Sequence, residues 1–286
     1  MASPDPDQVR RERVLQHVDV QRRGLEVGPS YNPLIPKSLF ANVSTLDHTD
    51  AASLRAKYRE MSLPEDLLAR IEDVDYLWDG GPLASAVPDG TTFDFIVGSH
   101  LIEHTVDLIG FLQDCQTLLV PGGRLVLVIP DMRYCFDHWQ SITSAGPVID
   151  AHFRPTRFHP PGALLDHMLY ATKKGGDLAW GPNDPRPLSL QFDDLSQVSS
   201  WYQIAAGQEE YFDIHRWRFT PTSLLLLLED LAAMGYHSLR PVAPAVEMGF
   251  EYALTLSSDA GYRPQYDAEH RLDLLRQIDA EVSAAR

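Results

Sequence analysis

Five successive apolar residues, LVLVI, lie within the segment Arg124–Pro130. A strand with one solvent-exposed face alternates polar and apolar residues, so an uninterrupted apolar run indicates a strand that is covered on both faces. A second apolar run is found at Phe93–Gly98, and Leu101–Leu119 between the two carries apolar residues at helical spacing. This order of strand, helix and strand predicts a parallel α/β sheet.

Shorter apolar runs that end at loops predict five further strands. They lie at Gly24–Val27, Asn42–Leu46, Asp73–Trp78, Tyr236–Val242 and Glu251–Leu256. A last helix is expected to begin at Thr220, which suits an N-cap, with Pro221 at the first helical position. Gly235 is expected to end this helix.

Prolines and histidines accumulate between residues 132 and 218, and the helical and strand periodicities fade there. Such a stretch is too long for a bare loop in a compact domain. We therefore expect an inserted cap with helices of its own, at Gly162–Thr172 and Leu195–Ala206.

The charge of the chain restricts its partners. Lys and Arg number 24 against 40 Asp and Glu, a formal net charge of −16, so the molecule repels phosphate backbones and anionic membranes. No segment approaches the roughly 18 apolar residues that span a bilayer, and the first twenty residues lack a secretory signal. Cys115 and Cys135 are too few for a disulfide framework. We expect a cytoplasmic protein that binds neither nucleic acid nor membranes.

Acidic residues close the first three strands. Glu26 is followed by Gly28, where the missing side chain lets a ligand approach the backbone. Asp47 follows Glu26 by about twenty residues, at a place where a carboxylate can accept both hydroxyl protons of a ribose. Asp79 ends the third strand, from which its carboxylate could reach an adenine amino group. Pro and Ser follow Gly28, so the fingerprint GxGxxG is absent and a diphosphate cofactor is disfavoured. Structural turns and a helix cap are the alternative roles for these residues.

The segment Ser99–His104, SHLIEH, follows the fourth strand, at the sheet edge where open α/β folds bind ligands. His100 and His104 are four residues apart, a spacing that on a helix puts two imidazoles on one face. The intervening Glu103, however, does not reproduce the zinc motif HExxH. We therefore expect no metal site.

Acceptor-side residues are expected at the same edge. Asp131 stands directly after the fifth strand, and Tyr134, Asp137 and His138 follow it closely. His215 precedes the last helix and could return from the cap to the same cleft, where an imidazole with an ordinary pKa near 6.5 suits proton removal. A purely structural role is the alternative for this histidine. The candidate catalytic residues are His100, Asp131, Tyr134, His138 and His215.

Four segments in chain order resemble the class I S-adenosylmethionine (SAM)-dependent methyltransferases. They are LEVGPSYNP at 25–33, LDH at 46–48, FDFIVGSHLIEH at 93–104 and LLVPGGRLVLVIPD at 118–131. SHLIEH and LVPGG resemble the type 11 branch in particular. DHTDAASLRAKY, PDMRYCFDHW and HRWRFTP are similar to motifs of a bacterial subgroup associated with glycan and natural-product gene neighbourhoods.

The resemblance implies a Rossmann-like, seven-stranded α/β sheet with SAM across the strand ends and a large cap inserted between the fifth strand and the last helix. It implies that Gly28 lies near the methionine part, Asp47 at the ribose and Asp79 at the adenine, with Ser99 and His100 beside the sulfonium. The candidate cofactor-binding residues are Glu26, Gly28, Pro29, Ser30, Asn32, Asp47, His48, Asp79, Gly80, Ser99, His100 and His104.

We expect five segments along the chain. They are an N-terminal helical segment at 1–20, a SAM-binding core at 21–131, a substrate cap at 132–218, the closing helix and β-hairpin of the core at 219–258, and a C-terminal tail helix at 259–286.

The expected function is transfer of a methyl group from SAM to a hydroxyl or amine of a small molecule or saccharide under the cap. Gly-Pro-Ser at 28–30 replaces the family's usual GxG, which leaves two alternatives. One is a SAM-fold protein that uses the cofactor for other chemistry, and the other is a non-catalytic binding protein. The sequence leaves the acceptor and the oligomeric state open, with a homodimer as one alternative.

Overall fold

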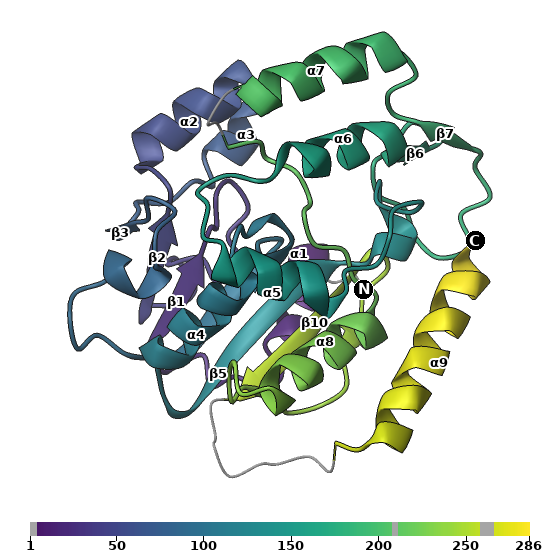
Figure 1. Ribbon diagram of the computed structural model, residues 1–286. Helices are drawn as coiled ribbons and strands as arrows, with labels where there is room; N and C mark the ends of the chain where they lie inside the picture. Colours follow the sequence, from purple (N-terminus) through teal and green to yellow (C-terminus); the bar gives the residue numbers. More distant parts are fainter. Residues whose placement is uncertain (1–4, 208–210, 258–265) are drawn as a thin grey trace.

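The computed structural model describes residues 5–207, 211–257 and 266–286. Over these residues the main sheet contains eight strands, and five of them are parallel neighbours in the order β3-β2-β1-β4-β5. These five are β1 (Gly24–Val27), β2 (Val43–Asp47), β3 (Tyr76–Leu77), β4 (Phe93–Ser99) and β5 (Leu119–Pro130). The predicted parallel α/β sheet is confirmed (Figure 1).

Three antiparallel strands complete the sheet. β10 (Glu251–Ser257) pairs along β5, and both β8 (Arg240–Pro241) and β9 (Val246–Glu247) pair with β10. The expected seven strands are therefore eight among the described residues. The predicted strand Tyr236–Val242 shrinks to β8, because prolines at 241 and 244 lack the N–H that a ladder needs. The chain then re-forms a short strand, β9, beside β10.

The described residues also form nine α-helices, three short 3-10 helices and a small two-stranded sheet. The α-helices are α1 (Pro6–Val14), α2 (Ala51–Glu60), α3 (Glu65–Leu68), α4 (Leu108–Leu118), α5 (Ala145–Phe153), α6 (Pro161–Tyr170), α7 (Leu195–Gly207), α8 (Pro221–Ala233) and α9 (Ala268–Ala285). The other elements are η1 (Leu83–Ala86), η2 (Ile102–His104), η3 (Met132–Tyr134), β6 (Thr172–Lys174) and β7 (Leu188–Leu190). None of the described helices is both long and apolar enough to cross a bilayer.

The two buried faces of β5 explain its uninterrupted apolar run. Leu125, Leu127 and Ile129 pack in one cluster with residues of α4, α5 and α8, while Val126 and Val128 pack in a second cluster that includes the end of α1. Figure 1 shows α4, α5 and α8 in front of the sheet and α1 behind it. The sheet is thus covered on both sides, as the sequence pattern predicted.

The helix that was predicted over Leu101–Leu119 is shorter in the structure. Residues 102–104 form the 3-10 helix η2, and α4 begins only after Asp107, whose carboxylate accepts a hydrogen bond from the Gly110 amide at 2.9 Å. This N-cap fixes the start of α4. As a result, His100 and His104 do not share one face of an α-helix.

The stretch from 132 to 218 packs in two ways. Val148 of α5 belongs to the same core cluster as β4 and β5, whereas α6 and α7 share a separate small cluster that contains Leu164, Met168 and Val198. Figure 1 shows α6 and α7 together at the top of the view, on the side of α2 and α3. The five-segment division stays a prediction, and its boundary at 258/259 lies outside the described residues.

Candidate active site

The loop after β1 is organised by a buried carboxylate. The two oxygens of Glu26, which is 1% exposed, accept hydrogen bonds from the backbone amides of Leu34 (2.7 Å) and Ile35 (3.1 Å). Burial raises the pKa of Glu26 to about 7. Glu26 therefore shapes the loop from inside, and its contacts are with the loop backbone.

The Gly-Pro-Ser turn has the left-handed backbone that glycines would give it. Gly28 has φ +68° and Ser30 has φ +53°, a conformation that is uncommon outside glycine. The Ser30 amide donates to Asp47 Oδ2 at 3.1 Å, and its hydroxyl is hydrogen-bonded to that of Tyr58. These contacts hold Ser30 in the strained region, so the replacement of GxG keeps the shape of the turn. Pro29 accepts a bond from the amide of the exposed Asn32, which closes the same turn.

Asp47 ends β2 with a carboxylate that is almost fully buried. Besides Ser30, it accepts from the backbone amide of His48 at 2.7 Å and lies 2.6 Å from His48 Nδ1. The His48 side chain is half exposed and covers the carboxylate from outside. Asp47 lies at the carboxyl end of a parallel strand, and its role at a ribose stays a prediction.

Asp79 and Gly80 lie at the surface. The Asp79 side chain is 75% exposed, and it accepts from the Gly81 amide at 3.0 Å and from Arg157 at 3.2 Å. Gly80 has φ +83° with open space around it. The contacts place Asp79 in a tight turn, which is one of the two roles that the sequence allowed.

His100 stands at the end of β4 in a strained backbone conformation, with φ +50°. Its Nε2 lies 2.8 Å from Glu251 Oε2, and Arg10 of α1 bonds both the other oxygen of Glu251 (2.7 Å) and the Ser99 hydroxyl (3.1 Å). Burial alone would raise the pKa of Glu251, but the hydrogen bonds to His100 and Arg10 hold this pKa at about 2. Ser99 and His100 are thus fixed by the first helix and the last strand.

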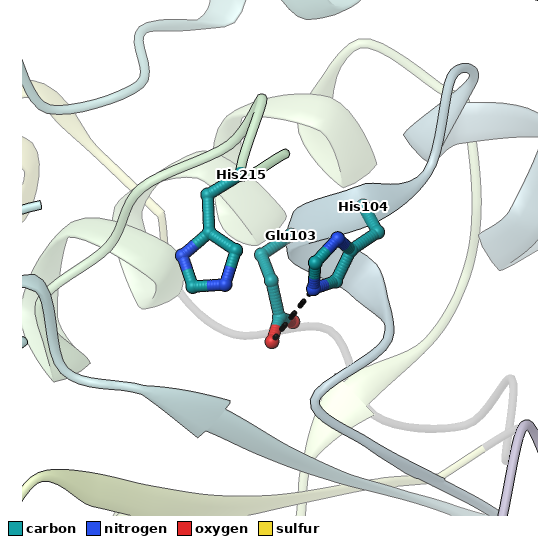
Figure 2. A group of neighbouring side chains, drawn as sticks. All are labelled: Glu103, His104 and His215. Carbon is teal, nitrogen blue, oxygen red and sulfur yellow. Dashed lines mark ion pairs between the residues drawn. The ribbon is translucent and has the colours of Figure 1, made fainter. Parts of the chain in front are cut away.

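A second cluster joins three residues that are far apart in the chain. Donor atoms of Glu103, His104 and His215 all lie within 4.8 Å of one another. Figure 2 shows both imidazoles beside the Glu103 carboxylate, and His104 Nε2 lies 3.9 Å from Glu103 Oε1. Glu103 is completely buried, and His215 is 6% exposed.

Two aspartates support this cluster from behind. His215 Nδ1 lies 2.6 Å from Asp137 Oδ2, and His104 Nδ1 lies 2.9 Å from Asp213 Oδ1. The bond to His104 lowers the pKa of Asp213 to about 2. Burial lowers the pKa of His104, but the bond to Asp213 and the charge of Glu103 outweigh it and raise this pKa. The imidazoles are therefore oriented by carboxylates on their outer side.

The remaining acceptor-side candidates are held by other partners. Asp131 forms a bidentate ion pair with Arg133, whose guanidinium also stacks over the Tyr134 ring at 5.1 Å. His138 Nδ1 lies 2.7 Å from the Arg133 carbonyl oxygen, and its ring contacts Trp139 and Trp180. The described contacts thus join His215 to Glu103 and His104, and they give Asp131, Tyr134 and His138 structural partners instead. Catalytic roles for these three stay predictions.

Glu103, Arg10, Asp213 and Glu251 were not among the site residues predicted from the sequence, although Glu103 lay within the SHLIEH segment. Asp213 had a weak signal, since it stands two residues before the candidate His215. Arg10 and Glu251 had none, because their ion pair joins residues 241 positions apart.

A parallel sheet covered on both faces, an antiparallel extension and carboxylates at the ends of β1 and β2 define a class I SAM-dependent methyltransferase. The family described as "Methyltransferase domain" matches residues 5–231. The chain belongs to this family, and its cofactor is S-adenosylmethionine. The residues fit this group, because the turn at Gly28 carries no side chain and Asp47 ends β2 beside it.

Similarity to individual proteins is limited. The ubiquinone biosynthesis O-methyltransferase of Parvibaculum lavamentivorans is 45% identical over 38 residues, which is 13% of this chain and 15% of that relative's length. A SAM-dependent methyltransferase structure from Aquifex aeolicus is 13% identical, with 88% of this chain and 93% of the other covered and a TM-score of 0.42. The glycopeptide N-methyltransferase MtfA is 14% identical, with 88% and 90% covered and a TM-score of 0.40.

Proposed function

We propose that this methyltransferase modifies a hydroxyl or amine of a small molecule or saccharide held between the carboxyl edge of the sheet and the α6–α7 cap. The observation that carries the proposal is the cluster of Glu103, His104 and His215. The cluster combines two imidazoles and a carboxylate just after β4, and His215 belongs to the predicted cap stretch 132–218.

Bound SAM supplies an electrophilic methyl carbon, and the acceptor atom loses a proton as the new bond forms. The protein then has two tasks, which are to position the acceptor and to assist that proton loss. Gly28 adds no side chain to the turn after β1, and we assign Asp47 to the ribose hydroxyls. The buried cluster, oriented by Asp137 and Asp213, is the group that we assign to acceptor activation.

Calorimetric titration with SAM and with S-adenosylhomocysteine tests the cofactor roles before the acceptor is known. Asp47→Ala should weaken binding of both by at least about tenfold, because the ribose loses a charged partner worth about 1.5–3 kcal/mol. Asp66→Ala, which removes an exposed carboxylate in α3, is the matched control and should bind normally. Unchanged affinity in Asp47→Ala would refute the ribose assignment.

An acceptor screen tests the transfer itself. Release of S-adenosylhomocysteine should be seen with hydroxylated or aminated small molecules or saccharides, and mass spectrometry of the product should show one added methyl group. If cofactor binds but is never converted with any acceptor of these classes, the non-transfer alternative replaces this proposal.

A further inference from the structure

Glu103 is a buried carboxyl group whose side-chain oxygens have no hydrogen-bond partner among the described residues. The residue is 0% exposed. The ring nitrogens His100 Nδ1 and His104 Nε2 lie 3.6 Å and 3.9 Å from Glu103 Oε1. Buried carboxylates are costly unless they are paired or bind a metal ion. A cation bound beside Glu103 would compensate this buried carboxylate.

The two imidazoles in Figure 2 present one nitrogen each toward this carboxylate. In both rings Nδ1 lies beside an aspartate oxygen, 2.9 Å from Asp213 Oδ1 for His104 and 2.6 Å from Asp137 Oδ2 for His215. The Nε2 atoms are thus the nitrogens left for a further partner. A carboxylate behind a histidine is the usual support of a metal-binding imidazole, because it fixes the tautomer and the ring orientation.

We propose that Glu103, His104 and His215 bind one divalent transition-metal ion, with Asp213 and Asp137 orienting the two histidines. Their donor atoms lie within 4.8 Å of one another. Ligands about 2.0 Å from a tetrahedral Zn²⁺ are about 3.3 Å apart, so a closure of about 1.5 Å at most completes the site. Two imidazoles and a carboxylate suit Zn²⁺, Co²⁺ or Fe²⁺ better than Mg²⁺ or Ca²⁺.

This set differs from the one that the sequence led us to reject. His100 and His104 were considered as a helical pair, but His100 turns toward Glu251 with a positive φ. His215, from the segment just before α8, is the second histidine of the proposed set. The proposal also accounts for Cys135, which lies near Asp137 and His215. Its thiol is 3.7 Å from Asp137 Oδ2 and adds to the support behind the histidine.

Three protein ligands leave one coordination position open, as in catalytic zinc sites. His104 is the member of the cluster with the most exposed side chain, at 23%. If the proposed function holds, a cation here lowers the pKa of an acceptor hydroxyl that approaches it. Metal binding itself does not depend on the transfer reaction, so the two proposals fail separately.

The test titrates the chelator-treated full-length protein with Zn²⁺ alone by calorimetry and repeats the titration with Co²⁺, whose visible absorption reports its ligands. We expect one equivalent of Zn²⁺ to bind. Glu103→Gln, His104→Ala and His215→Ala should each abolish this binding. Asp137→Asn should weaken it about 10- to 100-fold, because it removes only the support of His215. His17→Ala, which removes an exposed histidine outside the cluster, should change nothing.

Circular dichroism separates loss of the site from loss of the fold. Should Glu103→Gln unfold, His104→Ala gives the answer, since His104 is the most exposed of the three. Absence of one-equivalent binding in the wild type overturns the proposal. So does stoichiometric binding that survives in folded His104→Ala and His215→Ala variants, because the ion would then have other ligands.

Discussion

At the scale of single residues, Glu26 gives the protein a specific dependence of stability on pH. Its pKa is about 7 in the folded protein, against about 4.5 when it is exposed. Between these values the folded state holds a proton that the unfolded state has released, so the free energy of unfolding falls as pH rises from 4.5 to 7. The loss from this one group is up to about 3 kcal/mol and is complete above pH 7.

Glu26→Gln removes this dependence. The neutral amide does not titrate, but it turns an NH₂ group toward the backbone amide of Leu34 or Ile35, which then loses its acceptor at a cost of about 1–3 kcal/mol. Denaturant unfolding at pH 5 and pH 7.5 checks both effects. Glu60→Gln, at an exposed position in α2, is the control, and its free energy of unfolding should change with pH as in the wild type. If the free energy of unfolding of Glu26→Gln depends on pH as strongly as that of the wild type, other groups are responsible for this dependence.

Some residues of the candidate site had local signals in the sequence, but Glu103 and Asp213 were not predicted as site residues, and the grouping of the cluster could not be predicted. Strand ends and glycine turns indicated Glu26, Gly28 and Asp47, because these features are local in sequence. His215 and Glu103 are 112 residues apart, and no local spacing relates them. The zinc motif HExxH requires both histidines on one helix, whereas His215 lies in the irregular segment before α8.

At the scale of elements, α8 depends on a reciprocal cap. Thr220 Oγ1 accepts from the Ser223 amide at 3.2 Å, and Ser223 Oγ accepts from the Thr220 amide at 2.8 Å. Thr220 is fully buried, so water cannot replace these bonds. We expect Thr220→Ala to lower the free energy of unfolding by about 1–2 kcal/mol. Thr220→Ser keeps the hydroxyl, so its free energy of unfolding should fall clearly less in the same denaturant titration. Equal decreases in the two variants would show that the methyl group, and not the cap, stabilises the helix.

The same helix shows what the sequence could reveal about elements. Thr220, Pro221 and Gly235 marked the ends of α8 correctly, since each acts through local backbone geometry. The helix α5 was missed, because Gly146 and Pro147 in its first turn weaken any helical pattern. It forms because Val148 is buried against the core, a tertiary contact that overrides propensity.

At the scale of the whole molecule, packing suggests two levels of stability. The core cluster joins β4 and β5 to α4, α5 and α8, while α6 and α7 share only a small cluster of their own. Segments with few buried apolar contacts open locally at a lower free energy than the core. The predicted cap of 132–218 should therefore divide, with α5 as stable as the core and α6 and α7 less stable.

Native-state hydrogen exchange followed by mass spectrometry checks this division directly. Amides of α6 and α7 should exchange with opening free energies well below those of β4 and β5, and amides of α5 should exchange with the strands. If the amides of α5 instead have opening free energies like those of α6, then α5 belongs to the cap, as the predicted boundary at residue 132 implies. Uniform protection throughout would show that cap and core unfold as one unit. In that case, an acceptor could not enter by local opening of the cap, and its path would have to be present in the folded state.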